Sequence, residues 1–457
     1  MQHTRLNPKI QADLQIIGKI NCFFEIFSIS KLLHQCGVRK RHGHTSRSLI
    51  EAIFTLPFTG MNIFRGIVIN DDVPIGKDAI YDILKGTTYN WRRLLLLLGV
   101  RLHSFFSRLT DENRESVLII DDSTYERSRS KKVELLSRVK DHSTGRYLRG
   151  FRMQTVCWSD GVSTLPLDFS LLSSTNKKHR FCESQKQLDK RCCAYKRRKE
   201  ATVKSTDLLE PMIERILSAG IQAQYLLMDS WFGMPAIITK LSKHMNVICM
   251  AKKSSKVHYL FEGQSLDVKA IYRRLKKRRG RAKILASTNV TLKSGLPVKL
   301  TFVRDRRKKD WLVLLTTDIS LPEKDVVRIY GKRWDIEVFF KMAKQHLKLA
   351  KEIQCRDFDA IIAHTSIVFM RYMFVAYNCR LESDQRTFGD LFYACCDELK
   401  DISFVESLYR ILTLAMEKLK GIKLFCQNTV LKFFEIVMET ALASVSISKS
   451  KLITVKY

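Results

Sequence analysis

Glycine, proline and acidic residues are scarce in this chain of 457 residues. It contains 19 glycines and 8 prolines, about half the usual share, which excludes a collagen-like or low-complexity protein. Its 46 acidic residues are outnumbered by 79 lysines and arginines, so the net charge is +33. Because 45% of the residues are hydrophobic and 10% aromatic, a disordered polycation is also excluded. A folded protein of this charge predicts an extended polyanion, most simply nucleic acid, as its partner.

Zinc-binding and membrane-spanning signals are missing too. The twelve cysteines include two adjacent pairs, Cys192–Cys193 and Cys395–Cys396, but no CxxC motif, so we expect reduced thiols packed in cores. The longest apolar stretch, 361–377, is shorter than the roughly 20 residues of a membrane span and contains His364 and Arg371. The N-terminus has no signal-peptide pattern. We expect an intracellular protein without a membrane span.

The pattern of apolar, basic and turn-forming residues changes along the chain and predicts five segments. Residues 1–112 show apolar spacing of three and four and are expected to form helices that bind DNA. Residues 113–251 contain a hairpin signal and then alternating strands and helices, which predicts an α/β domain with a mixed sheet. Residues 252–317 are basic and rich in predicted strands, residues 318–350 form a long helix, and residues 351–457 are helical with a loose tail.

Two predicted strands end in aspartate. The apolar run Val117–Ile120 is followed by Asp121 and Asp122, and the run Tyr225–Met228 is followed by Asp229. Ligands of open α/β sheets bind at the carboxyl ends of strands, where a carboxylate is held on rigid backbone. Aspartate is also common there as a turn former, so either residue alone would be weak support for a site.

A third carboxylate, Glu337, lies on the long predicted helix, 322–349. At 100° per residue, Tyr330, Arg333, Glu337 and Lys344 fall within an arc of about 60°, and Lys341 lies beside them. One interpretation is a solvated stripe with an Arg333–Glu337 pair of little energetic weight. The other is a face that holds a phosphate next to a metal ligand.

These residues resemble a known family. The pattern Tyr330-x2-Arg333-x3-Glu337-x6-Lys344 is similar to the Y-x2-R-x3-E-x6-K signature of bacterial insertion-sequence transposases of the IS-four type, whose RNase H-like core carries a DDE triad. Segments 119–127 and 226–232 resemble the two aspartate motifs of that family. The surplus length between Asp229 and Glu337, which are 108 residues apart, fits the family's β-rich insertion. The resemblance covers about residues 115–350.

The resemblance implies a fold, a chemistry and partners. It implies an RNase H-like mixed sheet with flanking helices, in which Asp121, Asp229 and Glu337 are catalytic and bind two Mg²⁺ or Mn²⁺ ions. Asp122 also satisfies the first motif and stays an alternative to Asp121. The implied reaction is cleavage of double-stranded DNA at inverted-repeat element ends, through a hairpin, and strand transfer to target DNA. A homodimer on DNA, no membrane partner, and a cytoplasmic location at the bacterial nucleoid are expected.

The expected DNA contacts gather on the helix face and in three basic runs. The runs are 177–199, 273–283 and 304–309. Trp334, close to the active face, is a candidate for stacking on an extruded base, and Trp231 and Trp311 are weaker candidates. The remaining predicted DNA-binding residues are Tyr330, Arg333, Lys341, Lys344, Arg273, Arg274, Lys276, Lys277, Arg278, Arg279, Arg306, Arg307 and Lys308.

Three alternatives differ in their chemistry. An RNase H-like nuclease or resolvase would cleave without strand transfer, and a transposase-derived protein with a dead site would only bind DNA. A two-carboxylate glycosidase would explain neither the charge nor the cationic helix face.

Overall fold

A computed structural model describes residues 8–382, except residues 41, 69–74, 111–113, 142–143, 185, 281 and 306–309. The chain divides into two compact units, Met1–Asp384 and Gln385–Tyr457. The second unit, with the predicted tail and the Cys395–Cys396 pair, lies outside the described residues. Everything below concerns the first unit.

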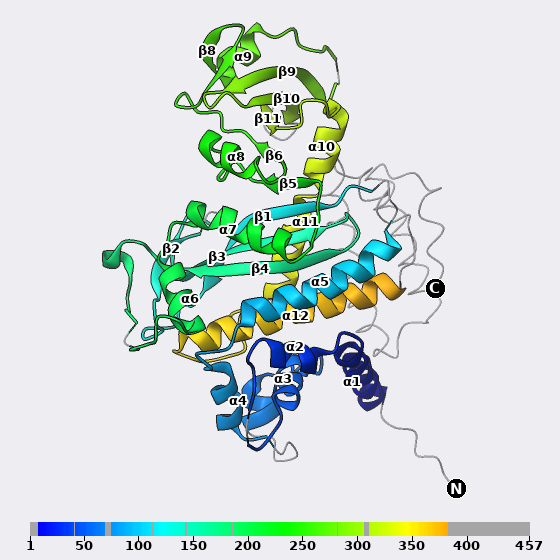
Figure 1. The fold of residues 1–457 in the computed structure, drawn as a ribbon, viewed down its shortest axis with the longest axis vertical. Helices are drawn as coiled ribbons and strands as arrows, with labels where there is room; N and C mark the ends of the chain where they lie inside the picture. Colours follow the sequence, from blue (N-terminus) through cyan, green and yellow to red (C-terminus); the bar gives the residue numbers. More distant parts are fainter. Residues whose placement is uncertain are drawn as a thin grey trace, which may run out of the picture. The chain divides into compact units, whose positions relative to one another are not determined.

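The N-terminal part of this unit is helical (Figure 1). The Thr45 side chain caps α3 by accepting the backbone N–H of Ser48, and Asn90 caps α5 by accepting that of Arg93. The apolar face of α5 is buried along its whole length, from Trp91 to Phe106. The helices are α1 (Pro8–Ile26), α2 (Ile29–Gln35), α3 (Ser46–Thr55), the π-helix η1 (Phe64–Val68), α4 (Lys77–Leu84) and α5 (Trp91–Leu109).

A mixed sheet follows, with the neighbour order β4-β3-β1-β5-β6 at its centre. Strands β1, β3 and β4 form an antiparallel meander, and β5 and β6 then run parallel to β1. This order is consistent with an RNase H-like fold, so the predicted fold class is confirmed. The strands are β1 (Val117–Glu126), β2 (Ser137–Lys140), β3 (Tyr147–Ser159), β4 (Thr164–Leu172), β5 (Tyr225–Met228) and β6 (Asn246–Met250). The 3₁₀-helix η2 (Lys177–His179), α6 (Cys193–Ala201), α7 (Ser205–Ser218) and α8 (Pro235–Leu241) connect them.

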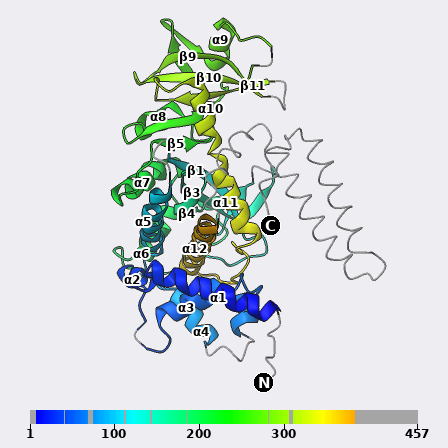
Figure 2. The ribbon, with the colours of Figure 1, turned by 90° about the vertical axis from the view of Figure 1, so that its right-hand side faces the viewer.

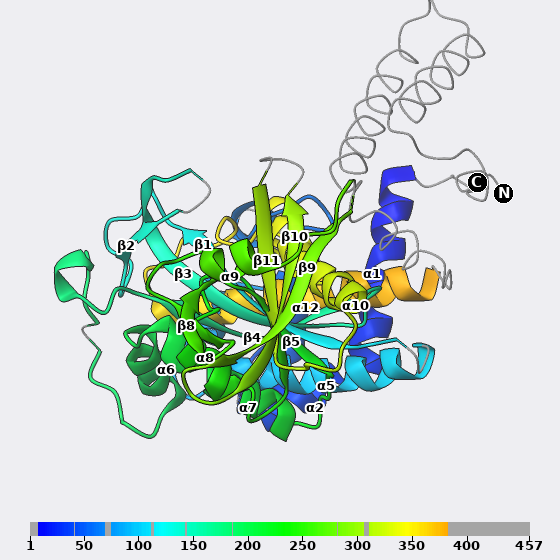
Figure 3. The same cartoon turned by 90° about the horizontal axis from the view of Figure 1, so that it is seen from above.

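The β-rich insertion extends this sheet. Strand β11 pairs antiparallel with β6, so the order continues β6-β11-β10-β9-β7-β8. Figure 3, seen from the insertion end, shows β9, β10 and β11 in front of the core strands. The sequence predicted the strands of the insertion but not their continuity with the core. Its elements are β7 (His258–Phe261), β8 (Gln264–Asp267), α9 (Val268–Arg274), β9 (Ile284–Leu292), β10 (Pro297–Asp305) and β11 (Asp310–Thr316).

The predicted long helix, 322–349, is two helices. Helix α10 (Glu323–Gly331) packs against the insertion, and α11 (Trp334–Gln345) packs on β1 and β4. Between them the backbone N–H groups of Lys332 and Arg333 reach back three residues, to Ile329 and Tyr330, as in a 3₁₀ turn. The prediction of one continuous helix is therefore wrong, since the change in hydrogen-bond pattern interrupts it directly before Trp334. Figure 2 shows α10 and α11 following one another down the side of the sheet.

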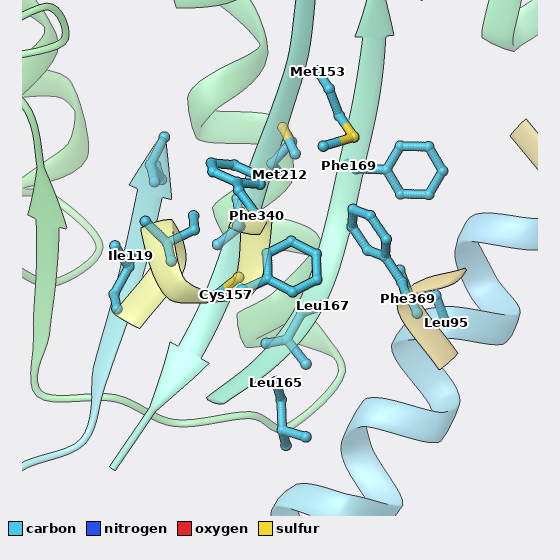
Figure 4. Close-up of a cluster of buried hydrophobic side chains, with 14 of the residues drawn as sticks. Leu95, Ile119, Met153, Cys157, Leu165, Leu167, Phe169, Met212, Phe340 and Phe369 are labelled. Carbon is cyan, nitrogen blue, oxygen red and sulfur yellow. The ribbon is translucent and has the colours of Figure 1, made fainter. Parts of the chain in front are cut away.

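Helices cover both faces of the sheet. On β4, the Phe169 ring contacts Phe369 of α12 (Phe358–Glu382), with centroids 4.9 Å apart, whereas the neighbouring Asp168 binds Arg215 of α7 at 2.7 Å. Because successive strand residues point to opposite faces, α12 and α7 lie on opposite sides. Figure 4 shows α5, α11 and α12 contributing Leu95, Phe340 and Phe369 to the same apolar cluster.

Helix α12 has the length and apolar composition of a membrane span over Phe358–Leu381, and it is the single such helix in the part of the chain described. Within that helix, 83% of the apolar window is buried inside the protein. Arg371 at its middle is fully buried and paired with Glu352 at 2.8 Å. These features are those of a core helix with an internal ion pair.

Candidate active site

The two aspartates meet at one edge of the sheet. Parallel strands β1 and β5 pair Ile120 with Met228, so Asp121 and Asp229 follow side by side. Asp229 comes directly after β5, but β1 continues to Glu126, so the prediction that this strand ends at Asp121 is wrong. Each carboxylate accepts the backbone N–H of the next residue, at 2.8 Å for Asp121 and 2.6 Å for Asp229. These local bonds orient both side chains.

Arg333 joins Glu337 to Asp121. Its Nη1 lies 3.0 Å from Asp121 Oδ2, and its Nη2 lies 2.6 Å from Glu337 Oε1. The side chains of Arg333 and Asp121 are 15% and 18% exposed, whereas Glu337 is 34% exposed and faces the entrance. The structure therefore brings two of the predicted acids onto one guanidinium and places the third, Asp229, beside Asp121.

The electrostatics of this cluster favour a bound cation. Burial raises the pKa of Asp121 to about 7, and the charges of Asp122 and Asp229 add to the rise, although Arg333 opposes it. A carboxyl group with this pKa is destabilised as an anion until more positive charge arrives. Three carboxylates form an all-oxygen donor set, which suits Mg²⁺ or Mn²⁺. The residues present thus fit a divalent-metal site.

Tyr330 and Lys344 complete the predicted face. The Tyr330 hydroxyl is buried and has no hydrogen-bond partner among the described residues, and burial raises its pKa. Lys344 Nζ donates to Ser123 Oγ at 2.6 Å, and burial lowers its pKa. The helix face chosen from the sequence is therefore brought onto the edge that carries the aspartates, despite the 3₁₀ turn. Ser123, the third residue of the first motif, is a contact that the sequence analysis did not single out.

Asp122 lies on the other face of β1. It accepts two hydrogen bonds from Arg152 Nη1 on β3, at 2.8 and 2.9 Å. Arg152 also donates to the Lys140 carbonyl of β2, at 3.1 Å. Asp122 thus ties β2 and β3 to β1, and the geometry favours Asp121 over Asp122 as the first ligand.

The three tryptophans considered for base stacking differ in exposure. Trp334 is 40% exposed, at the start of α11 beside Arg333, and Lys341 is exposed on the same helix. Trp231 is 47% exposed, and the Lys252 ammonium lies 5.0 Å from its ring centre. Trp311 stacks on Tyr272, with centroids 4.4 Å apart, and is a packing residue of the insertion.

The basic runs do not all face outward. In the run 177–199, Arg197 and Arg198 are paired with the buried Asp359 of α12, and Lys186 binds Asp357 at 2.5 Å. The sequence predicted DNA contact along this whole run, but the charges of Arg197 and Arg198 are neutralised inside the fold, whereas Lys186 remains 36% exposed. These three side chains attach α6 and its preceding loop to α12.

The run 273–283 lies at the end of α9 and in the loop after it. Within it, Arg278 binds Glu323 at the start of α10. The other predicted contacts that the structure describes in this run, Arg273, Arg274, Lys276, Lys277 and Arg279, are exposed. Arg306, Arg307 and Lys308 lie outside the described residues.

One cluster of possible metal ligands was not expected. Glu210 and Glu214 of α7 and His244 after α8 bring ligand atoms within 4.8 Å of one another. Lys240 already binds Glu210 at 2.6 Å. The i,i+4 spacing of the glutamates is a signal in the sequence, but the approach of His244 depends on the packing of α7 and α8.

Comparison with known proteins agrees with this geometry. Residues 69–295 match the family model of the DDE superfamily endonucleases. The match includes Asp121 and Asp229 and ends before Glu337. This part of the chain is therefore similar to a DDE superfamily endonuclease domain.

A relative with a curated name is more distant. The Sinorhizobium fredii protein named "Putative transposase y4zB" is 30% identical over 117 residues, which is 25% of this chain and 33% of that protein. The match thus spans about a third of the relative's own length.

Proposed function

We propose that this protein is a DDE transposase that cleaves the ends of an insertion sequence and joins them to target DNA. The observation that carries the proposal is that Arg333 joins Asp121 to Glu337, with Asp229 beside Asp121. The endonuclease family match and the similarity to the named relative support it. The charge of +33 supports DNA as the substrate.

Asp121, Asp229 and Glu337 would hold two Mg²⁺ or Mn²⁺ ions. When bound, such ions supply an activated oxygen nucleophile and neutralise the charge of the leaving oxygen. The protein contributes positioning rather than covalent catalysis. Arg333, held between two of the carboxylates, can swing one of its N–H groups to a phosphate oxygen. The Lys344 ammonium and the Tyr330 hydroxyl offer further donors at the same edge.

Trp334 is the proposed stacking residue for a hairpin intermediate. Its ring is 40% exposed and follows Arg333 directly in the chain. Stacking of one base on an aromatic ring contributes roughly 1–3 kcal/mol, enough to offset much of the free energy of flipping a nucleotide out of the helix. The exposed residues Arg273, Arg274, Lys276, Lys277 and Arg279 would contact the DNA backbone, and Lys341 would do so beside the site.

The partners and the location of the protein belong to the same proposal. Joining two element ends requires at least two copies on the DNA, so a homodimer is expected in the complex. A cytoplasmic location at the nucleoid follows from the substrate.

The test is cleavage of a duplex that carries the inverted repeats flanking the coding region. Glu337→Gln keeps the shape of the side chain but removes its charge, so it should bind this duplex as wild type does and lose metal-dependent cleavage by a factor of at least 10³, or about 4 kcal/mol. Glu262→Gln, an exposed glutamate between β7 and β8, is the matched control and should cleave normally. Retained cleavage by Glu337→Gln would refute the assignment of Glu337 as a catalytic residue.

The same reactions separate the alternatives. Strand transfer of the cut ends into a supercoiled plasmid supports a transposase, whereas cleavage without joining identifies a nuclease or resolvase. Binding without any cleavage in Mg²⁺ or Mn²⁺ identifies an inactive DNA-binding protein.

A further inference from the structure

A second basic surface lies beyond the carboxylates on the hairpin of β2 and β3. Residues 127–152 contain nine basic and two acidic residues, a net charge of +7. Five exposed side chains of this region form what we call the basic hairpin face. They are Arg138 and Lys140 of β2, Tyr147 and Arg149 of β3, and Phe181 of the segment beside β2.

Strand register places this face on the same side of the sheet as Asp121. Asp121 pairs with Thr155, and alternate residues of β3 lead from Thr155 to Arg149 on one face. Arg138 pairs directly with Arg149, so both side chains share that face. Six residues at about 3.3 Å each put Arg149 roughly 20 Å from Thr155 along the strand. That distance corresponds to about six base pairs of duplex.

The turn of this hairpin also approaches α11. Burial lowers the pKa of Lys344, and Asp141, which follows β2, opposes that shift by its charge. The interaction places Asp141 near Lys344. Because Asp141 directly follows Lys140, the Lys140 end of the basic hairpin face is the end directed toward α11.

The arrangement of charge on this face is unfavourable for the free protein. Arg138 stands directly opposite Arg149, and like charges at such positions destabilise a hairpin. Neither arginine forms an ion pair with any residue that the structure describes. In the same hairpin, Arg152 is neutralised by Asp122. Among the described residues, Arg152, which anchors the hairpin, thus has an acidic partner, whereas the outward-facing Arg138 and Arg149 have none.

Aromatic rings support both outward arginines. The Arg138 guanidinium lies 4.0 Å from the centre of the Tyr147 ring, and the Arg149 guanidinium lies 4.9 Å from that of Phe181. Such contacts hold a guanidinium in place without cancelling its charge. Because the cations already cover these rings, the face offers ordered positive charge rather than open platforms for base stacking.

We propose that the basic hairpin face binds the phosphate backbone of duplex DNA next to the segment held at the carboxylates. Arg138 and Arg149 each contact one phosphate, and Lys140 adds a third positive charge. The contact is independent of sequence, because backbone phosphates carry none of the base pattern. This inference rests on the proposed function, since it assigns a path to the same DNA.

The test compares salt dependence of binding in EDTA, where cleavage plays no part. The probe is a labelled duplex of roughly 40 base pairs, about four helical turns. Its binding constant is measured by fluorescence anisotropy between about 50 and 200 mM salt. The double variant Arg138→Gln/Arg149→Gln should lower the slope of log K against log salt by about 1.8, from about 0.9 per lost phosphate contact. Affinity near physiological salt should fall on the order of tenfold or more.

Two further variants make the result specific. Arg108→Gln/Lys243→Gln removes the same charge from exposed positions that precede β1 and β6, at the opposite edge of the sheet, and should leave the slope within about 0.5 of wild type. Arg138→Lys/Arg149→Lys retains the charge and should restore most of the slope. The proposal is overturned if the glutamine variant keeps the wild-type slope, or if the control variant loses as much.

The outcome is separable from the proposed function. If wild type cleaves element ends and the glutamine variant binds duplex like wild type, this surface is wrong and the transposase proposal stands. If the glutamine variant shows the expected loss of slope relative to wild type but wild type never cleaves, the surface stands and the catalytic proposal fails. If wild type binds no duplex, both are refuted.

Discussion

The buried ion pair of Arg371 and Glu352 allows the most quantitative prediction. Both side chains are fully buried, and Arg371 donates to the two carboxylate oxygens of Glu352, at 2.8 and 3.1 Å. Arg371 also donates to the carbonyls of Ile53 and Phe54 at the end of α3 and of Leu347 after α11. The perturbation is Arg371→Met, which removes the guanidinium and leaves the buried carboxylate of Glu352 with the His364 ring, 2.6 Å away, as its remaining charged or polar side-chain partner among the described residues.

Two independent lines give the magnitude. Removing one partner of a buried ion pair costs about 3–5 kcal/mol, because the remaining charge is left uncompensated. Burial alone would raise the pKa of Glu352, but Arg371 and His364 lower it from 4.5 to about 2. At about 1.4 kcal/mol per pKa unit, that depression, which Arg371 and His364 produce together, corresponds to about 3 kcal/mol and is an upper bound on the share of Arg371. We expect Arg371→Met to lower the free energy of unfolding at neutral pH by about 3–5 kcal/mol.

The pH dependence has a definite sign. Because folding lowers the pKa of Glu352, its contribution is complete above the unfolded value near 4.5 and is lost as pH falls toward 2. The stability advantage of wild type over Arg371→Met/Glu352→Leu should therefore shrink between about pH 5 and pH 2.

Urea unfolding followed by tryptophan fluorescence measures both effects. The control Arg108→Met removes an exposed arginine of α5 and should change stability by at most about 0.5 kcal/mol. The double variant Arg371→Met/Glu352→Leu removes both charges and should recover at least half of the loss. A loss below about 1 kcal/mol for Arg371→Met, or a double variant as unstable as the sum of the single changes, would refute the reasoning.

Two glycines give further predictions. A Cβ at Gly233 would lie 2.7 Å from the Met250 carbonyl oxygen, so Gly233→Ala should shift the turn after Asp229. We expect cleavage to fall at least tenfold while DNA binding in EDTA stays normal. A wild-type cleavage rate would contradict this. A Cβ at Gly150 would lie 2.2 Å from the Tyr125 carbonyl oxygen, so Gly150→Ala should destabilise the protein by about 1–3 kcal/mol in urea unfolding; a neutral result would show that β1 and β3 can separate there.

Most elements of the core are visible in local pattern. The hairpin of β3 and β4 follows from two apolar runs around Ser159–Gly161, and β5 follows from a four-residue apolar run. Local periodicity reports which side of an element is buried, and that is enough to predict helices, strands and a mixed sheet. Local periodicity does not tell which strands pair with each other, so the pairing of β11 with β6 was not predictable.

The candidate site divides in the same way. The candidate residues could be proposed from the sequence, because the helical spacing of Tyr330, Arg333 and Lys344 and the apolar runs before the two aspartates are local properties. The choice between Asp121 and Asp122 could not, because neighbouring strand residues differ only in which face they meet, and Arg333 and Arg152 lie far away in the chain.

The distribution of charge shows most clearly what cannot be predicted from the sequence. The sequence by itself determined that the protein is strongly basic and where its basic runs lie. Only the tertiary structure decided which charges remain available for a polyanion. Arg197 and Arg198 are neutralised by Asp359 of a distant helix, whereas Arg138 and Arg149 are set side by side on an exposed face. Neutralisation depends on distances of a few ångströms between residues far apart in the chain, and packing alone sets those distances.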